Sequence, residues 1–356
     1  MPMMAVAQLK YGERLSENVL TKLGNILFYK GKVVSERDIE ILKAFLIQSV
    51  PIESKNGADN EELVEESKTK EDAIVIHPFY LEYHNMLNLL RHVYNLANGG
   101  QSLPILDIRT RLEALLLHIE QYKVLTFSPR NANIGDYIYH KSIMVSLSSY
   151  TLAKWIGVPQ KDLLQVALGG LLHDIGNVKV DQLILAKKKA LTHSEMDEVK
   201  KHTIAGYAIL KNVPALTEGA KLCALQHHER EDGSGYPLGV KSDKIHSFAK
   251  IVAISDIYHA MTNDRVYKSS MSPYLVLEQL FTESFGKLDP SMVQVFINRT
   301  TQFGHGTLVK LSDNRVGEIV FSDRSNPTRP WVNVNGSIVN LATERTLFIK
   351  DVIGLI

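Results

Sequence analysis

The segment Gly169-Gly170-Leu171-Leu172-His173-Asp174-Ile175-Gly176 closes an apolar run with a histidine and a carboxylate. Residues 163–172 are apolar on nearly every side of a helix, which predicts a helix in a core. Burying a carboxylate costs on the order of several kcal/mol unless a metal or a charged partner offsets it. We therefore interpret His173 and Asp174 as neighbouring metal ligands at the C-terminus of this helix. Gly176 is expected to let the chain turn out of the helix.

Further imidazole and carboxylate side chains follow, most of them at the ends of apolar segments: His202, His227, His228 and Asp256. Together with His173 and Asp174 they offer nitrogen and oxygen ligands without a thiolate, which is typical of a two-metal hydrolytic centre. Asp174 is the natural bridge, because the two oxygens of a carboxylate can span ions about 3.5–4 Å apart. We assign Asp174 the central catalytic role.

The order of these residues, with Gly235-Tyr236-Pro237 shortly after the histidine doublet, resembles the HD-GYP family, whose members hydrolyse cyclic di-GMP. The resemblance runs from about residue 134 to about residue 300 and includes residues 228–230, 232–237 and 264–268. It implies a cyclic di-GMP phosphodiesterase that releases a linear dinucleotide or GMP. It also implies two divalent transition metals, iron or manganese with zinc as the alternative, and the ligand types suit all three. The implied ligands of one ion are His173 and Asp256, and those of the other are His202, His227 and His228.

The same resemblance implies which residues contact the substrate. They are Tyr236, Asn177, Arg265 and Lys268. Arg265 and Lys268 are placed to bind phosphate, and Tyr236 lies on a glycine-flanked loop that could reach the ligand or a partner protein. A surface ion pair with Asp264 or another acidic residue is an equally good interpretation of Arg265.

The sequence departs from the family where the metal-binding domain begins. An ungapped match through residues 152–157 places Lys141, rather than His140, at the family's first metal-binding histidine. One step along a helix rotates a side chain by about 100°, so the two residues cannot face the site together. Either the helix start is distorted and His140 binds a metal, or the site has one ligand fewer with an ammonium beside it. In that second case Lys141 must be neutral, turned away or in the place of an ion.

Further departures bear on activity. Asn177 replaces the lysine of the family's His-Asp-Ile-Gly-Lys motif, His259 replaces its second aspartate, and Lys187-Lys188-Lys189 keeps only the lysine of its Lys-Pro-Gly motif. These differences leave open a degenerate relative that binds nucleotide or partner proteins with little or no turnover. A general phosphohydrolase of the wider HD superfamily is a third interpretation, against which the Gly-Tyr-Pro motif argues.

Composition limits the partners. The chain carries 40 basic and 39 acidic residues, a net charge of +1, which argues against a nucleic-acid polymer as partner but allows a small anionic ligand. The single cysteine, Cys223, is expected in a helical core, which fits a reducing compartment. No apolar stretch approaches the ~20 residues that span a bilayer, and residues 1–9 lack signal-peptide features. We expect a cytoplasmic protein with no membrane association.

The predicted fold class is mainly α: an all-helical HD-type metallohydrolase domain with small β-rich modules at the N-terminus and C-terminus. Residues 1–52 predict short strands at 6–9, 19–20 and 26–29 and a helix capped by Ser35, resembling a module often found ahead of HD-GYP domains. The remaining predicted segments are an acidic linker (53–76), a helical hairpin (77–130), the HD-GYP domain (131–300) and a barrel-like β appendage (301–356).

Two of these segments carry more detailed predictions. The hairpin consists of helices at 80–96 and 105–125, and its apolar stripe is typical of a core or a homodimer interface. The C-terminal appendage has predicted strands at 307–311, 317–321 and 331–334.

Overall fold

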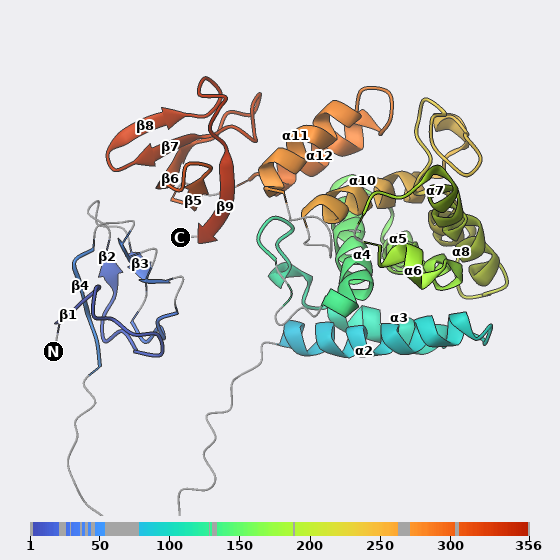
Figure 1. The fold of residues 1–356 in the computed structure, drawn as a ribbon, viewed down its shortest axis with the longest axis horizontal. Coiled ribbons are helices and arrows are strands. Elements are labelled where there is room, and N and C mark those ends of the chain that lie inside the picture. Colours follow the sequence, from blue (N-terminus) through green and yellow to red (C-terminus); the bar gives the residue numbers. More distant parts are fainter. Residues whose placement is uncertain are drawn as a thin grey trace, which may run out of the picture. The chain divides into compact units, whose positions relative to one another are not determined.

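The computed structural model describes residues 3–20, 26–28, 30–35, 38–39, 42–43, 47–53, 78–127, 129, 134–187, 189–262, 271–302 and 306–354. The chain divides into two compact units, one of Ile76–Gln302 and one that combines Met1–Val75 with Phe303–Ile356. The fold is mainly α, with small antiparallel sheets in the two terminal segments, as the sequence predicts (Figure 1). No described helix is both long enough and apolar enough to cross a bilayer.

The first unit is helical, and Figure 1 follows its elements from α2 in cyan to α12 in orange. Its α-helices are α2 (Pro78–Asn98), α3 (Ile105–Leu116), α4 (Tyr137–Trp155), α5 (Gln160–Leu172), α6 (Gln182–Leu185), α7 (His193–Lys200), α8 (His202–Leu210), α9 (Glu218–Gln226), α10 (Ser247–Thr262), α11 (Pro273–Glu283) and α12 (Pro290–Thr300). Short 3₁₀ turns are η1 (Ile119–Gln121), η2 (Ile134–Asp136), η3 (Ile175–Lys179) and η4 (Ser242–Lys244).

Helix α5 lies in the core, as its apolar sequence predicts, and packs against α4, α9 and α10. Its two glycines make this close packing possible. A Cβ at Gly169 would lie 2.6 Å from Cys223 Sγ in α9, and a Cβ at Gly170 would lie 3.1 Å from Ser146 Cα in α4. Cys223 is fully buried, as expected. The glycine pair therefore fixes how near the His173 end of α5 comes to its neighbours.

Gly176 has a different role from the predicted one. It does not adopt a positive φ at the end of α5; it lies within η3. A Cβ at Gly176 would overlap the carbonyl oxygen of His202 and the backbone of Gly206. The absence of a side chain thus allows η3 to lie directly on α8, which brings His202 next to the end of α5.

The second helix of the predicted hairpin ends earlier than expected, at Leu116 rather than Leu125. Leu117 is 82% exposed, so the apolar stripe does not continue along the same face. After η1, Tyr122, Val124 and Leu125 are buried from an irregular segment instead. Their apolar character had suggested a longer helix because burial in a loop and burial on a helix give similar short patterns.

The other unit contains the strands. They are β1 (Met3–Ala5), β2 (Val19–Leu20), β3 (Ile26–Phe28), β4 (Ser49–Pro51), β5 (Leu308–Leu311), β6 (Val316–Phe321), β7 (Trp331–Val334), β8 (Ser337–Asn340) and β9 (Ile349–Gly354). Antiparallel pairs β1–β4 and β2–β3 form in the N-terminal segment, and an antiparallel sheet of order β8-β7-β6-β5-β9 forms in the C-terminal segment.

The predicted strands at 19–20, 26–29, 307–311, 317–321 and 331–334 are present, with small differences at their ends. The strand predicted at residues 6–9 is wrong, because the chain turns there and the strand is β1. Strands β8 and β9 were not predicted, although Asn335-Gly336 (φ 53° and 90°) is a typical two-residue hairpin turn between β7 and β8. Most of the helix predicted after Ser35, and linker residues 54–76, lie outside the described residues.

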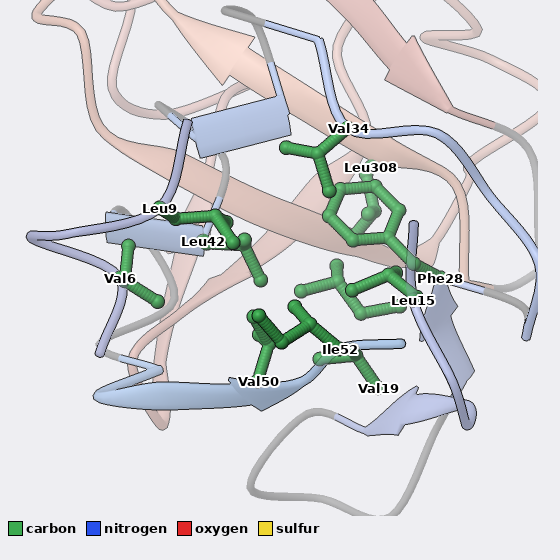
Figure 2. Close-up of a cluster of buried hydrophobic side chains, with 11 residues drawn as sticks. Val6, Leu9, Leu15, Val19, Phe28, Val34, Leu42, Val50, Ile52 and Leu308 are labelled. Carbon is green, nitrogen blue, oxygen red and sulfur yellow. The ribbon is translucent and has the colours of Figure 1, made fainter. Parts of the chain in front are cut away.

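The two terminal segments share one hydrophobic core. Leu308 of β5 is 4% exposed and belongs to a cluster otherwise drawn from the N-terminal segment, against which Ile353 of β9 also packs. Figure 2 shows Leu308 with Phe28, Val34 and Leu15 in this cluster. Residues nearly three hundred positions apart thus stabilise each other by burying common apolar surface. The five-segment division stays a prediction, to which the structure adds this joint terminal unit.

Candidate metal centre

Separate helices of the first unit bring imidazole, carboxylate and ammonium groups to one place. They come from the ends of α5 and α9, the start of α8 and the interiors of α4 and α10. The gathered residues are Lys141, His173, Asp174, His202, His227, His228 and Asp256. All are buried except His228, which is partly exposed. Water is therefore largely excluded, and each charge depends on its protein partners.

Three of the histidines use one ring nitrogen to bind the backbone. The Nδ1 atoms lie 2.7 Å (His173 to Gly170 O), 2.6 Å (His202 to Val199 O) and 2.8 Å (His227 to Cys223 O) from carbonyl oxygens. These carbonyls belong to the last turns of α5, α7 and α9, and those of Val199 and Cys223 accept a backbone N–H as well as the imidazole N–H. Because a carbonyl oxygen only accepts, Nδ1 carries a proton in each of the three rings, and Nε2 of the neutral His202 and His227 rings presents a lone pair. Metal-binding histidines are commonly oriented in this way.

The Nε2 atoms of His202 and His227 converge on Asp174. They lie 3.4 Å apart, and they lie 3.4 Å and 3.7 Å from Asp174 Oδ1. Lone pairs held this close repel one another unless a cation lies between them. Ligands about 2.1 Å from one tetrahedral ion lie about 3.4 Å apart, so the observed spacing fits a shared metal ion. His228 joins the group, because its ligand atom lies within 4.8 Å of those of His202 and His227.

A second group of potential ligands is formed by His173, His227 and Asp256, again within 4.8 Å of one another. Here the carboxylates already have a cationic partner. Lys141 Nζ lies 2.6 Å from Asp256 Oδ1 and 2.8 Å from Asp174 Oδ2. His173 Nε2 lies 3.3 Å from the same two oxygens. The two groups therefore differ in character, since one has free lone pairs and the other has an ammonium bridge.

In the ammonium bridge, the charges of Lys141, Asp174 and Asp256 stabilise one another, as the directions of their pKa shifts indicate. Burial opposes the charge of Lys141, but Asp174 and Asp256 outweigh it and raise the pKa of the ammonium above its usual range. Burial would raise the pKa of each carboxyl, but Lys141 and His173 hold both values well below the usual range. For His173, the neighbouring carboxylates outweigh burial and raise the pKa to about 9. Lys141, Asp174 and Asp256 are thus ionised at neutral pH.

The other histidines are uncharged at neutral pH. Burial lowers the pKa of His202 and of His227, and it lowers the pKa of His228 to about 3. A neutral imidazole is the form that binds a metal ion. The pKa directions therefore agree with the ligand role that the distances indicate for these rings.

The Gly-Tyr-Pro segment lies beside this group. The Tyr236 ring stacks on His228 with centroids 4.6 Å apart, and the Tyr236 amide donates to the His228 carbonyl oxygen at 3.2 Å. A Cβ at Gly235 would overlap the backbone of Arg230 and Glu229, so the loop can approach this closely only with glycine there. Burial raises the pKa of Tyr236, which keeps its hydroxyl protonated and able to donate a hydrogen bond.

The comparisons with known proteins identify similar proteins and the domain that carries this group. Residues 123–292 match the HD domain family. The chain is 31% identical over 199 residues to the cyclic di-GMP phosphodiesterase PA4108 of Pseudomonas aeruginosa, covering 56% of this chain and 48% of that protein. Residues 123–292 form an HD domain.

Two other relatives extend the comparison. The cyclic di-GMP phosphodiesterase PdeB of Borreliella burgdorferi is 25% identical over 323 residues, covering 86% of this chain and 82% of PdeB. The 3'3'-cGAMP-specific phosphodiesterase 1 of Vibrio cholerae is 27% identical over 230 residues, covering 63% of this chain and 49% of that protein. The chain thus spans about half the length of PA4108 and of the Vibrio protein, and more of PdeB.

One solved structure supports the fold. Bd1817, described as a HDG"Y"P protein from Bdellovibrio bacteriovorus, matches with a TM-score of 0.51 and 17% sequence identity. The match covers 83% of this chain and 97% of that chain. At this identity the likeness concerns the fold alone.

Within the HD domain, Lys141 rather than His140 faces the candidate metal centre. His140 Nδ1 lies 3.0 Å from the hydroxyl of Tyr83 in α2, and the two rings stack with centroids 5.8 Å apart. His140 is 5% exposed, so this pairing occupies it inside the core. The undistorted start of α4 therefore places the two side chains on different faces, as the 100° rotation predicts.

His259, the residue at the family's second aspartate position, also lies outside the two ligand groups. Its Nε2 atom lies 2.8 Å from Ser148 Oγ and 3.1 Å from the Tyr122 hydroxyl. Burial lowers the pKa of His259 to about 3, so the ring is neutral. This departure places a hydrogen-bonded core residue where the resemblance implies an acidic one.

The other predicted substrate residues have separate outcomes. Asn177 is 9% exposed in η3, and its backbone amide donates to the Asp174 carbonyl oxygen at 3.0 Å, so it lies close to the centre. Arg265 and Lys268 lie outside the described residues. Lys187, the lysine kept from the family's Lys-Pro-Gly motif, forms an ion pair with Glu195, and its Nζ lies 2.6 Å from Glu195 Oε2.

Glu229 lies within residues 228–230 of the resemblance, but no role was predicted for it. Its carboxylate is 2% exposed and accepts hydrogen bonds from the amides of Leu238 (2.7 Å) and Val240 (3.1 Å). It thereby closes the loop that carries Tyr236. Its burial was not predicted, because acidic side chains are more often solvated.

Proposed function

We propose that this protein is a metal-dependent phosphodiesterase that hydrolyses cyclic di-GMP to a linear dinucleotide or GMP. The observation that carries the proposal is the convergence of His202 Nε2, His227 Nε2 and Asp174 Oδ1 at 3.4–3.7 Å in a buried site of an HD domain. Relatives that share this domain are named as cyclic di-GMP phosphodiesterases. Neutral imidazoles with a carboxylate suit iron or manganese, with zinc as the alternative.

The chain's own residues would hold and orient the reacting groups. His202, His227, His228 and Asp174 would hold a divalent ion, fixed by the backbone hydrogen bonds of the imidazole rings. Such an ion, when bound, stabilises negative charge on phosphoryl oxygens and lowers the pKa of a bound water. Asp174 Oδ2 remains paired with Lys141, which keeps its Oδ1 directed at the imidazoles.

Substrate contacts are proposed for residues beside the histidine group and for residues that the sequence predicts. The Tyr236 ring stacks on His228 and its hydroxyl is protonated, so the hydroxyl is available to donate a hydrogen bond to a phosphate or base. Lys200 Nζ lies 5.8 Å from the Tyr236 ring centroid and adds a positive charge beside it. Asn177, Arg265 and Lys268 stay predicted substrate contacts.

A second candidate function is nucleotide or partner-protein binding with little turnover. The observation that favours it is the Lys141 ammonium, which binds two of the carboxylate oxygens that an ion would otherwise use.

Three further predictions from the sequence stay predictions. They are the cytoplasmic location, the homodimer and the binding of partner proteins at the Tyr236 loop.

The test uses the full chain purified without air and loaded with Mn²⁺ or Fe²⁺. Cyclic di-GMP and 3'3'-cGAMP are offered separately, and products are identified by chromatography. We expect cyclic di-GMP to give linear dinucleotide or GMP and a chelator to abolish turnover. His202→Ala should lower the rate by at least about 100-fold, whereas His193→Ala, at an exposed position, is the matched control.

Three outcomes are distinguishable. Preferential cleavage of 3'3'-cGAMP would reassign the substrate. Cyclic di-GMP binding without product in metal-loaded protein would favour the second candidate. Turnover that is unaffected by His202→Ala would place the reaction elsewhere.

A further inference from the structure

Asp174 divides its two oxygens between different partners. Oδ1 lies 3.4 Å from His202 Nε2 and 3.7 Å from His227 Nε2, atoms that present lone pairs. Oδ2 lies 2.8 Å from Lys141 Nζ. Among the described residues, one side of the carboxylate thus faces two imidazole nitrogens, and the other side faces an ammonium.

We infer that the Lys141 ammonium takes the place of one of two metal ions, so that this centre binds a single divalent ion on His202, His227, His228 and Asp174. The inference rests on the metal dependence in the proposed function and deepens it. It changes the predicted cofactor from two ions to one.

The first argument is competition for the same oxygens. Asp256 Oδ1 and Asp174 Oδ2 lie 2.6 Å and 2.8 Å from Nζ, which are distances of strong charge-assisted hydrogen bonds. An ion bound about 2.1 Å from Asp256 Oδ1 would lie within about 5 Å of the ammonium. Ammonium and ion would repel each other, and both would need lone pairs of the same atoms.

The second argument is the burial of Lys141. Its side chain is only 11% exposed, and the side chains of Asp174 and Asp256 are 7% and 5% exposed. To make room for an ion, this largely buried ammonium would have to leave both carboxylates. Breaking a buried ion pair is strongly unfavourable when one charge remains uncompensated, so the bridge resists displacement.

The third argument is the count of ligands on each side. The group of His202, His227 and His228 retains its three imidazoles and gains Asp174 Oδ1. The group of His173, His227 and Asp256 shares His227 with the first and has a lysine where the resemblance implies a further imidazole. His173 is also held against both carboxylate oxygens, at 3.3 Å from each. The second group therefore offers fewer ligands, and the Lys141 ammonium already compensates the negative charge of its carboxylates.

The experiment counts metal ions in the full chain. Wild type, Lys141→His, Lys141→Met and His140→Gln are purified without air, loaded with excess Mn²⁺, freed of loose metal and measured by mass spectrometry of the metal. Electron paramagnetic resonance then distinguishes isolated Mn²⁺ from a spin-coupled pair. Thermal unfolding of each protein verifies that it is folded.

We expect about one ion per chain with an isolated-ion spectrum in wild type and in His140→Gln. His140 is the matched control because it neighbours Lys141 on α4 but binds Tyr83. Lys141→His, which removes the ammonium and adds an imidazole, should bind about two ions with a coupled spectrum. Lys141→Met removes only the charge, so its second ion should bind more weakly than that of Lys141→His.

Two ions in the wild type would overturn the inference, and so would a folded Lys141→His variant that still binds only one. These outcomes are separate from the fate of the proposed function. Two ions with cyclic di-GMP hydrolysis would remove the inference and keep the function. One ion without hydrolysis would keep the inference and remove the function.

Discussion

His202 Nε2 lies 3.4 Å from His227 Nε2, although the hydrogen bonds of both Nδ1 atoms to backbone carbonyls leave each Nε2 with a lone pair. A cation between the two rings would turn this repulsion into attraction. An ion that binds only the folded state stabilises the chain by about 2.7 kcal/mol at a hundredfold excess over its Kd.

We therefore predict that metal-loaded wild type melts at a higher temperature than chelator-treated wild type. His202→Ala should abolish most of this difference and lower the metal content, because it removes one ligand from the group. Differential scanning calorimetry with and without chelator measures both proteins. The exposed His193→Ala variant should keep the full difference, and equal melting temperatures in all cases would contradict an occupied centre.

Gly176→Ala should destabilise the chain by roughly 2 kcal/mol or more, because overpacking a tight contact forces the backbone apart. A Cβ at this position would overlap the His202 carbonyl oxygen and Gly206, so η3 and α8 would have to separate. The free energy of unfolding in urea and the metal content should fall together. Gly135→Ala is the control, since a Cβ at Gly135 meets no atom within 4 Å.

The lowered pKa of the buried His259 predicts that the chain loses stability in acid. Its pKa is lowered from 6.5 to about 3 by burial, so below pH 6.5 the unfolded chain binds a proton that the folded chain does not. His259 therefore does not lower the free energy of unfolding above about pH 6.5. Below that pH the free energy of unfolding falls towards pH 3, by at most about 1.4 kcal/mol per pH unit for this residue.

His259→Gln removes this titration while retaining a side chain that can hydrogen bond. Between pH 7 and pH 5, the free energy of unfolding measured in urea should fall less steeply for His259→Gln than for wild type. The two curves should begin to diverge at about pH 6.5. His193→Gln at an exposed position should leave the wild-type slope unchanged. Parallel curves for wild type and His259→Gln would mean that His259 is protonated in the folded chain.

Leu308→Ala should destabilise the N-terminal strands although Leu308 belongs to a C-terminal strand. The substitution leaves a cavity in a core shared by both segments, at a cost of roughly 2–3 kcal/mol. Hydrogen exchange should become faster at Val50 in β4 as well as in β5. Ile338→Ala on β8, where the side chain is 55% exposed, should have little effect. Unchanged exchange at Val50 would contradict the shared core.

Much of the helical unit could be predicted from the sequence. The apolar residues of α5 and the polar His173-Asp174 pair at its end lie next to each other in the chain, and a helical pattern reports such neighbours directly. The C-terminal strands β5, β6 and β7 followed from equally local patterns. The boundary at Leu116 was missed because an apolar loop and an apolar helix give similar short runs.

The partners of individual side chains needed the tertiary structure. From the sequence, three states of Lys141 remained open: neutral, turned away from the site, or in the place of an ion. The packing of α4 against α5 and α10 selected the ion-paired arrangement. The same holds for His259, whose partner Tyr122 is 137 residues away.

By itself the sequence determined which segments form helices or strands and which residue types are available as ligands, because these properties depend on near neighbours in the chain. Only the tertiary structure decided that Gly176 serves close packing, that His140 binds Tyr83, and that Leu308 completes an N-terminal core. Such contacts join residues distant in sequence, and their energies depend on burial and distance rather than on sequence spacing.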